Sequence, residues 1–230
     1  MYPNEAVQDV LPGQLIIPLY VVIDAPGPKP THGEVIQSSV MALFSRLAQD
    51  PVVRDVVWAS VMNLGSSLEV AKPLSPLGPV KGLTVAGGSQ PTPLSAMWRD
   101  FHKVLNTDLD HIHTVKARAY PPIVVVMTTR QHSDSHHQAR SEFETLLGSS
   151  TTPLHPRVIA CGFEIDNTDA LAHLAYPVEG ERPGTWVNFT QPDVATTVSV
   201  VAQAIYGVVA PVGEQQGLTA PGVKEGVAQP

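Results

Sequence analysis

The chain has 230 residues, of which 43% are hydrophobic and 15% charged, and its formal net charge is −7 at pH 7. This composition is typical of one large globular domain or two small ones, and it excludes a disordered chain. No run of Lys or Arg supplies the basic surface that phosphate neutralisation needs, so nucleic acid is excluded as the expected partner.

The single cysteine, Cys161, excludes an intrachain disulfide and a cysteine-rich zinc site, and it suits a reducing compartment. Residues 1–14 lack the basic region and the apolar run of a signal peptide. We also expect no apolar stretch as long as the roughly 20 residues that span a bilayer. These features predict a cytoplasmic protein without a membrane partner.

The first expected element is a strand at residues 15–23, LIIPLYVVI, because a continuous apolar run is typical of a strand covered on both faces. Pro18 has no N–H to donate, so it predicts the start of the strand or a bulge. A helix follows, with Thr31 and Glu34 as a capping box. Apolar residues repeat at helical spacing along it, at Ile36, Val40, Phe44 and Leu47.

Residues 55–74 predict two strands joined by a short turn near residues 65–67, which is a β-hairpin. Residues 82–93 predict a short strand that enters a glycine turn. Thr92 is the expected N-cap of the next helix, with Pro93 at its first position. One apolar face of this long helix is formed by Leu94, Met97, Trp98, Phe101, Leu105, Leu109 and Ile112.

The second half of the chain continues to alternate strands and helices. Strands are expected at residues 121–129, 157–163 and 185–189. Helices are expected at residues 133–148, at residues 166–175, and from Thr190 and Asp193 onward. Residues 211–230 alternate Gly, Pro and polar residues and predict a flexible tail, so the domain covers residues 14–210 after an N-terminal extension of residues 1–13.

This order of elements predicts a three-layer α/β/α sandwich with a mostly parallel, doubly wound sheet and one antiparallel edge hairpin. In open sheets of this kind, ligands bind outside the carboxyl ends of the strands. The loops expected at that end are residues 24–33, 86–92, 129–137, 163–167 and 177–184. Any functional site is therefore expected there.

Four segments carry a family resemblance by their order and spacing. They are LYVVIDAPGP at 19–28, VWASVMNLGSSLEVAKPLSPL at 57–77, LTVAGGSQPTPLSAM at 83–97 and PPIVVVMTTRQHSD at 121–134. Over residues 14–209 the chain resembles the von Willebrand factor A domain family, and it is most similar to the stand-alone bacterial type associated with tellurium-resistance and stress-response systems. The resemblance implies a Rossmann-like fold and a non-catalytic, protein–protein interaction module of a multiprotein system.

The same resemblance implies where a metal-ion-dependent adhesion site would lie. The family's first loop has an Asp-x-Ser-x-Ser pattern, of which this chain keeps the leading Asp24. The two serine positions are occupied by Pro26 and Pro28. The glycine turn of the family supplies a threonine, and the matching position here is Ser89, or Thr92 in the alternative register.

The last family ligand is an aspartate after the fourth strand, and the matching position here is Thr129, followed by Arg130. Mg²⁺ prefers several hard oxygen ligands in a near-octahedral arrangement. Proline offers no side-chain oxygen, Thr129 is neutral, and Arg130 brings a like charge close to the cation. The resemblance therefore implies a degenerate adhesion site without a metal ion.

We expect the loops at the strand ends to form a rim that binds a protein partner. The residues expected on that rim are Asp24, Gly88, Ser89, Thr92, Thr129, Arg130, His132 and Asp134. Arg130 is a candidate to contact an acidic group of the partner directly. Cys161, mid-strand between apolar residues, predicts an inert core thiol.

Two alternatives remain open. In the first, the chain is a Mg²⁺-dependent adhesion module that uses Asp24, Ser89 and Asp134 in a rearranged geometry. In the second, it is a hydrolase or transferase with a histidine from residues 132–137 as its base, although the same histidines also suit a polar loop or a transition-metal ligand.

Overall fold

The central strand of the sheet is β1 (Leu15–Asp24), and all ten of its residues are buried. The computed structural model describes residues 10–24, 30–80, 82–85, 93–129, 136–148, 150–152, 154–175 and 184–215. The other described strands are β2 (Val57–Leu64), β3 (Leu68–Pro76), β4 (Arg118–Ala119), β5 (Ile123–Thr128), β6 (Arg157–Phe163) and β7 (Thr185–Phe189). The described helices are α1 (Pro30–Leu47), α2 (Pro51–Val56), α3 (Leu94–Thr114), α4 (His136–Leu147), α5 (Asp169–Leu174) and α6 (Val194–Gln215).

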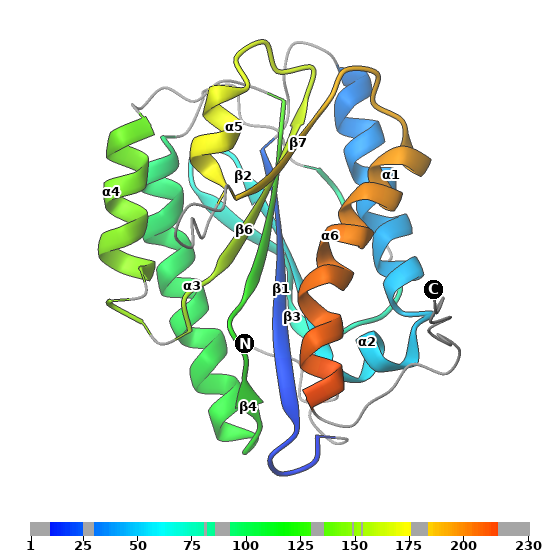
Figure 1. Ribbon diagram of the computed structural model, residues 1–230, viewed down its shortest axis with the longest axis vertical. Helices are drawn as coiled ribbons and strands as arrows, with labels where there is room; N and C mark the ends of the chain where they lie inside the picture. The colour runs from blue at the N-terminus through cyan, green and yellow to red at the C-terminus, as the bar shows by residue number, and fades with distance from the viewer. Residues whose placement is uncertain are drawn as a thin grey trace, which may run out of the picture.

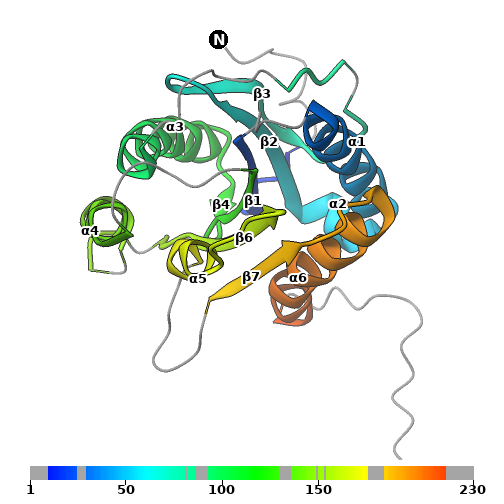
Figure 2. The same ribbon diagram turned by 90° about the horizontal axis from the view of Figure 1, so that it is seen from above.

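The sheet has the order β3-β2-β1-β5-β6-β7, and β4 pairs with the beginning of β1 (Figure 1). Every described pair is parallel except β2–β3, the predicted edge hairpin. Figure 2 shows α1 and α6 on one face of the sheet and α3, α4 and α5 on the other. The predicted three-layer sandwich is therefore confirmed, with one antiparallel pair in a mostly parallel sheet.

The two faces of β1 supply two separate cores, because successive side chains of a strand point to opposite faces. Ile17, Leu19, Val21 and Ile23 pack with α1 and α6, whereas Ile16, Tyr20 and Val22 pack with α3 and α4. All seven side chains are fully buried. This double coverage explains why β1 is a continuous apolar run instead of an alternating pattern.

Pro18 lies in the middle of β1, where the strand changes its neighbour. β1 pairs with β4 through Ile16 and with β5 only from Leu19 onward. The Ile16 carbonyl accepts the N–H of Tyr120, and alternate residues of a strand direct their backbone groups to the same side. The missing N–H of Pro18 therefore falls at a break in this ladder. Pro18 marks neither the start of the strand nor a bulge, which corrects the prediction.

Several element boundaries differ from the predictions. α1 begins at Pro30, so Thr31 lies inside the helix and is not its cap. Pro93 is the N-cap of α3 and not its first residue. At α6 the Asp193 carboxylate accepts the N–H of Thr196 at 2.9 Å and caps that helix. Proline's fixed φ suits both the extended cap and the first helical position, so local sequence does not separate the two.

Other elements were missed or wrongly predicted. Residues 83–85 form no strand, and Leu83 instead packs into the core on the α1 face. The short α2 and the two-residue β4 were not predicted, since neither is long enough to show a period. Residues 211–215, predicted to start the tail, are the end of α6, and residues 216–230 lie outside the described part.

By length and composition, α6 is the one helix of the described ranges that could cross a membrane, in the window Val194–Pro211. This window corrects the expectation that no such stretch exists. Only 33% of the window is buried. The buried apolar side chains join the core shared with α1 and are Val198, Val201, Ala202, Ile205 and Val209, and Thr197 is also buried.

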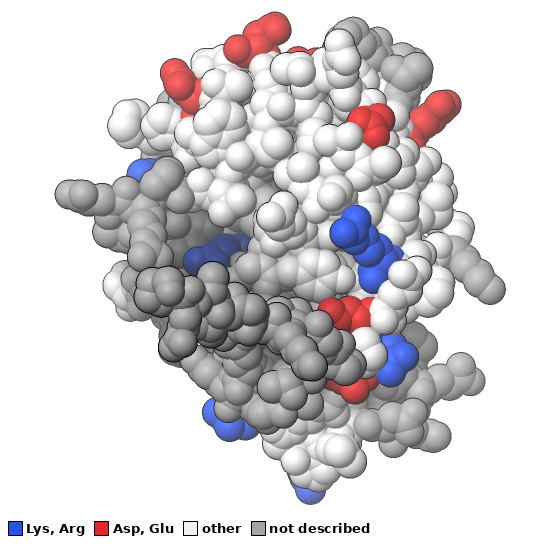
Figure 3. Space-filling view, turned by 45° about the vertical axis from the view of Figure 1, so that its right-hand side comes forward, with Lys and Arg blue, Asp and Glu red and all other residues white. Residues whose placement is uncertain are grey.

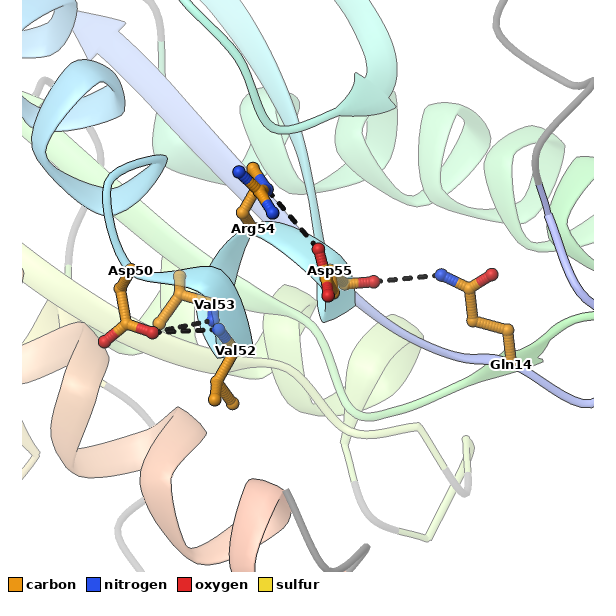
Figure 4. Close-up of polar contacts among 6 residues, drawn as sticks. All are labelled: Gln14, Asp50, Val52, Val53, Arg54 and Asp55. Atoms are coloured by element: carbon orange, nitrogen blue, oxygen red, sulfur yellow. Dashed lines mark hydrogen bonds and ion pairs between the residues drawn. The ribbon is translucent and has the colours of Figure 1, made fainter. Parts of the chain in front are cut away.

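Two polar contacts hold α2 in place at the end of the molecule where β1 begins (Figure 4). The Asp50 carboxylate accepts the N–H of Val52 at 2.9 Å and that of Val53 at 3.3 Å, which caps the helix. The Gln14 side chain, just before β1, donates to the carbonyl of Asp55 at 2.9 Å. Together these contacts tie α2 to the central strand.

We predict that Asp50→Ala lowers the free energy of unfolding by about 1 kcal/mol, because two N–H groups at the start of α2 lose their acceptor. Urea unfolding followed by circular dichroism measures this loss. Asp55→Ala is the matched control, since the Asp55 carboxylate is exposed and pairs only with the exposed Arg54. An equal loss in both variants would contradict the capping role.

Candidate functional site

The carboxyl ends of β1, β2, β5, β6 and β7 meet at one end of the molecule, together with the first turns of α1, α5 and α6. We call this end the rim. It lies at the top of Figure 1. Parallel strands bring their ends together in this way, and loops there carry ligands in open α/β sheets.

Asp24 is the last residue of β1, and Thr128 lies opposite it on β5. The Thr128 hydroxyl donates to Asp24 Oδ2 at 2.7 Å, and the N–H of Thr129 donates to the Asp24 carbonyl at 3.2 Å. Asp24 and Thr128 are each 1% exposed. The residue that contacts the carboxylate is thus Thr128, which the sequence analysis did not single out.

Near the ends of β2 and β5, two buried polar atoms have no hydrogen-bond partner among the described residues. They are the hydroxyl oxygen of Thr129 and the amide oxygen of Asn63, which lies near the end of β2. The amide nitrogen of Asn63 donates to the Thr84 carbonyl at 3.0 Å and so fixes the side chain. Asn63 pairs in register with Ile23, so it stands next to the end of β1.

A second contact at the rim joins α1 to the turn after β6. The His32 imidazole Nε2 and the Glu164 Oε2 are 3.6 Å apart, which makes an ion pair when the imidazole is protonated. Glu164 has a φ of 54°, a conformation that L residues rarely adopt. The Asn188 side chain holds this turn by accepting the N–H of Ile165 and donating to its carbonyl.

The exposed charged side chains in the first turns of α1, α5 and α6 and after β6 are acidic. Figure 3 shows acidic groups gathered at the top of the face in view. The exposed carboxylates at the starts of α1, α5 and α6 and after β6 belong to Glu34, Glu164, Asp166, Asp169 and Asp193. The described residues of these segments, 30–34, 164–169 and 190–194, include no Lys or Arg.

Most of the predicted rim residues lie outside the described part of the chain. These are Pro26, Pro28, Gly88, Ser89, Thr92, Arg130, His132 and Asp134. The predictions that rest on them, including the contact of Arg130 with an acidic partner group, are therefore untested. Asp24 and Thr129 are described, and the structure brings them together at the end of adjacent strands.

The described rim offers a cation few ligands. Asp24 supplies one carboxylate, and Thr129 supplies a neutral hydroxyl. Within the described ranges, no group of three or more His, Cys, Asp and Glu side chains could hold a metal ion. Since Mg²⁺ prefers several hard, mostly anionic oxygen ligands, the described donors do not fit it.

The described residues also bring together no pair of a nucleophile and a base at the rim. His137 is exposed on α4, and no described carboxylate contacts its imidazole. Cys161 is fully buried in β6, as predicted, and burial raises the pKa of its thiol to about 12. Neither side chain has the surroundings that an activated catalytic group needs.

Lys72 lines a cavity of about 470 Å³ beside Asn63. Its hydrogen bonds give this side chain a structural role in the pairing of β2 with β3. The pairing of β2 with β3 shifts register between Ala59 and Val61. The Lys72 ammonium donates to the Ala59 carbonyl at 2.8 Å and to the Ser75 hydroxyl. Burial lowers the pKa of Lys72 to about 8. Its bond to the Ala59 carbonyl gives a partner to a backbone oxygen at the register shift between β2 and β3.

A buried polar pair lies between the sheet and α3. The Tyr20 hydroxyl donates to Asp108 Oδ2 at 2.9 Å, and Asp108 is 2% exposed. Asp108 also lines a cavity of about 370 Å³ whose other walls are mostly apolar side chains of β3 and α3. Burial raises the pKa of Asp108 to about 7 and also raises the pKa of Tyr20.

No protein-family model matches the chain, and no curated protein matches its sequence. Solved structures are similar in fold. A von Willebrand factor type A protein from Catenulispora acidiphila superposes with a TM-score of 0.51 and 11% identity over 83% of this chain and 42% of its own. The PilB minor pilin from Streptococcus sanguinis gives a TM-score of 0.58 and 12% identity over 89% of this chain and 64% of its own.

A third similar structure is proximal thread matrix protein 1 from the mussel byssus with a zinc-occupied MIDAS motif. Its TM-score is 0.53 at 13% identity, and the match covers 86% of this chain and 49% of the other. Across such matches the chain spans between 31% and 64% of the length of the solved chains. At these identities the similarity shows the fold, which confirms the predicted von Willebrand A type.

We predict that the contribution of Asp108 to the stability of the fold falls as the pH rises from about 4 to about 7. Burial raises the pKa of Asp108 from 3.8 to about 7, so the folded chain keeps a proton that the unfolded chain has already released. Stability from this group is therefore complete at low pH and is lost on approaching pH 7, at up to about 1.4 kcal/mol per pH unit.

Urea unfolding across this pH range measures the slope, which Asp108→Asn should flatten while retaining an acceptor for Tyr20. Asp110→Asn changes an exposed carboxylate on the same helix and should leave the slope unaltered. An unchanged slope in Asp108→Asn would contradict the assignment.

Proposed function

We propose that this chain, which has the fold of von Willebrand factor A domains, is a non-catalytic module that binds a partner protein at its rim. The fold occurs in the minor pilin and the byssus matrix protein named above, and this supports an interaction role in general. The resemblance of the sequence adds the more specific proposal of a bacterial, cytoplasmic stress-response system of the tellurium-resistance type.

The observation that carries the proposal is the acidic surface of the rim above a rigid, buried base. Exposed carboxylates gather on the described segments, while Asp24 and Thr128 lie bonded to each other beneath them. Charge complementarity gives specificity and faster association at such a surface. We therefore propose that the partner presents Lys or Arg side chains to the rim.

The proposed basic partner differs from the acidic partner group that Arg130 suggested. That residue alone would favour an acidic group, but it lies outside the described part, whereas five described carboxylates favour a basic one. The alternative of a hydrolase or transferase gains no support, because no described carboxylate orients His137.

We also propose that the adhesion site has lost its metal ion. Asp24 is the one described carboxylate in the first family loop, and its Oδ2 already accepts the Thr128 hydroxyl. The two prolines at the serine positions bring no further ligand. In this interpretation Asp24 stabilises the end of β1 by hydrogen bonding and does not ligate a cation.

We predict that reversing charge at the rim abolishes partner binding. Glu34→Lys combined with Asp166→Lys changes two exposed carboxylates for which no described contact is lost. The chain is used as bait in a cell lysate, and captured proteins are identified by mass spectrometry. The proteins retained by the unaltered chain should be absent with the double variant and should be released by raised salt.

Asp55→Lys is the matched control, because it reverses an exposed charge on α2 at the other end of the molecule. It should retain the same captured proteins. Equal capture by all three chains would rule out the rim as the binding surface.

We predict no rise in melting temperature on addition of millimolar Mg²⁺, because a cation that does not bind the folded chain cannot stabilise it. Differential scanning calorimetry with and without the cation measures this. A rise of several degrees that disappears in Asp24→Asn would instead establish the Mg²⁺-dependent alternative.

A further inference from the structure

The outer edge of β7 carries backbone groups that have no partner among the described residues. β7 is the last strand in the described sheet order, and within the described ranges it pairs with β6 alone. The Phe189 carbonyl accepts the N–H of Glu164, so Phe189 and the alternate residues Val187 and Thr185 face β6. Trp186 and Asn188 therefore direct their N–H and C=O groups outward, and neither backbone has a further bond within the described chain.

The two edges of the sheet differ in how they are protected. An exposed edge strand is a template for pairing with another chain, and proteins block such pairing with charges, prolines and bulges. β3 has all of these, with Glu69, Lys72, Pro73 and Pro76 in its sequence and register shifts against β2. β7, TWVNF, contains no charge and no proline, and its ladder with β6 is regular.

The α6 side of this edge is also uncharged from residue 194 to residue 211, whereas α5 on the other side carries the exposed Asp169. Figure 2 shows β7 at one side of the sheet between α5 and α6. Trp186 on β7 is 40% exposed and Val200 on α6 is 36% exposed, which is half of the exposed large hydrophobic side chains in the described ranges. α6 carries no charged residue from Val194 to Pro211, although only 33% of this window is buried. An ordinary surface helix has charges on its outer face.

We propose that a second copy of this chain occupies this edge, by antiparallel pairing of the two β7 strands about a two-fold axis at Val187. In this register Trp186 of each copy lies opposite Asn188 of the other. Both residues direct their N–H and C=O groups outward, so four backbone hydrogen bonds form. The sheet then continues from one copy into the other, and the two α6 helices lie on the same face of this continuous sheet.

A second copy fits the edge better than an unrelated surface for two reasons. An edge strand is complementary to itself under a two-fold axis, because it offers donors and acceptors at the same residues. Each chain also carries a net charge of −7, and β7 and residues 194–211 of α6 contribute none of it, so two copies repel each other less here than at the acidic rim. The proposed edge meets the rim at the carboxyl end of β7, but the proposal does not depend on the proposed function.

The oligomeric state tests the proposal directly. The chain has a mass of 24.6 kDa, and sedimentation equilibrium should show twice that mass at high concentration. Half of the chains should be dimeric at a chain concentration between about 1 and 100 μM. Tryptophan fluorescence gives a second readout, because Trp58 and Trp98 are buried at 3% and 0% exposure. Dimerisation should therefore shift the emission of Trp186 to the blue as the concentration rises.

Trp186→Lys should keep the chain monomeric, because it would place two like-charged ammonium groups at the interface between the two β7 strands. Trp186→Pro should do the same by removing an outward N–H while leaving the ladder with β6 intact. Val70→Lys is the matched control, since Val70 is 43% exposed on the other edge strand, and it should still dimerise. A mass of 24.6 kDa at every concentration would overturn the proposal, as would a dimer that persists in Trp186→Lys.

Discussion

The rest of the structure depends on the complete burial of β1. Ten consecutive residues of this strand lack contact with water on either face, so two layers of helices and a neighbouring strand on each side are required. The apolar faces of α1 and α3 meet this requirement from opposite sides. Even Pro18 is accommodated, because its missing N–H coincides with the change of neighbour from β4 to β5.

The polar residues of β1 all belong to the α3 face of the sheet. Tyr20 donates to Asp108 of α3, and Asp24 accepts from Thr128 of β5, with all four side chains buried or nearly so. A buried polar group without a partner costs free energy, so these bonds allow polar groups in an otherwise apolar layer. The consequence is a rim whose base is rigid, while its exposed carboxylates remain available to a partner.

The two edge strands, β3 and β7, differ in how well they are protected against pairing with another chain. β3 combines charge, proline and an irregular register, and Lys72 closes the irregularity by donating to the Ala59 carbonyl. β7 has none of these devices beside an uncharged helix face. The rim includes the carboxyl end of β7, so the proposed partner and the proposed second copy lie on adjoining surfaces.

Local apolar periods in the sequence predict the long strands and helices in their order, the two-faced burial of β1, the edge hairpin and the end of the sheet where Asp24 lies, but not the short α2 and β4. Which side chains meet depends on the tertiary structure. Thr128 contacts Asp24 although 104 positions separate them, and Asp108 contacts Tyr20 across 88 positions. Register between strands and the rotation of a helix on the sheet set such pairs, and neither is encoded in the pattern of one segment alone.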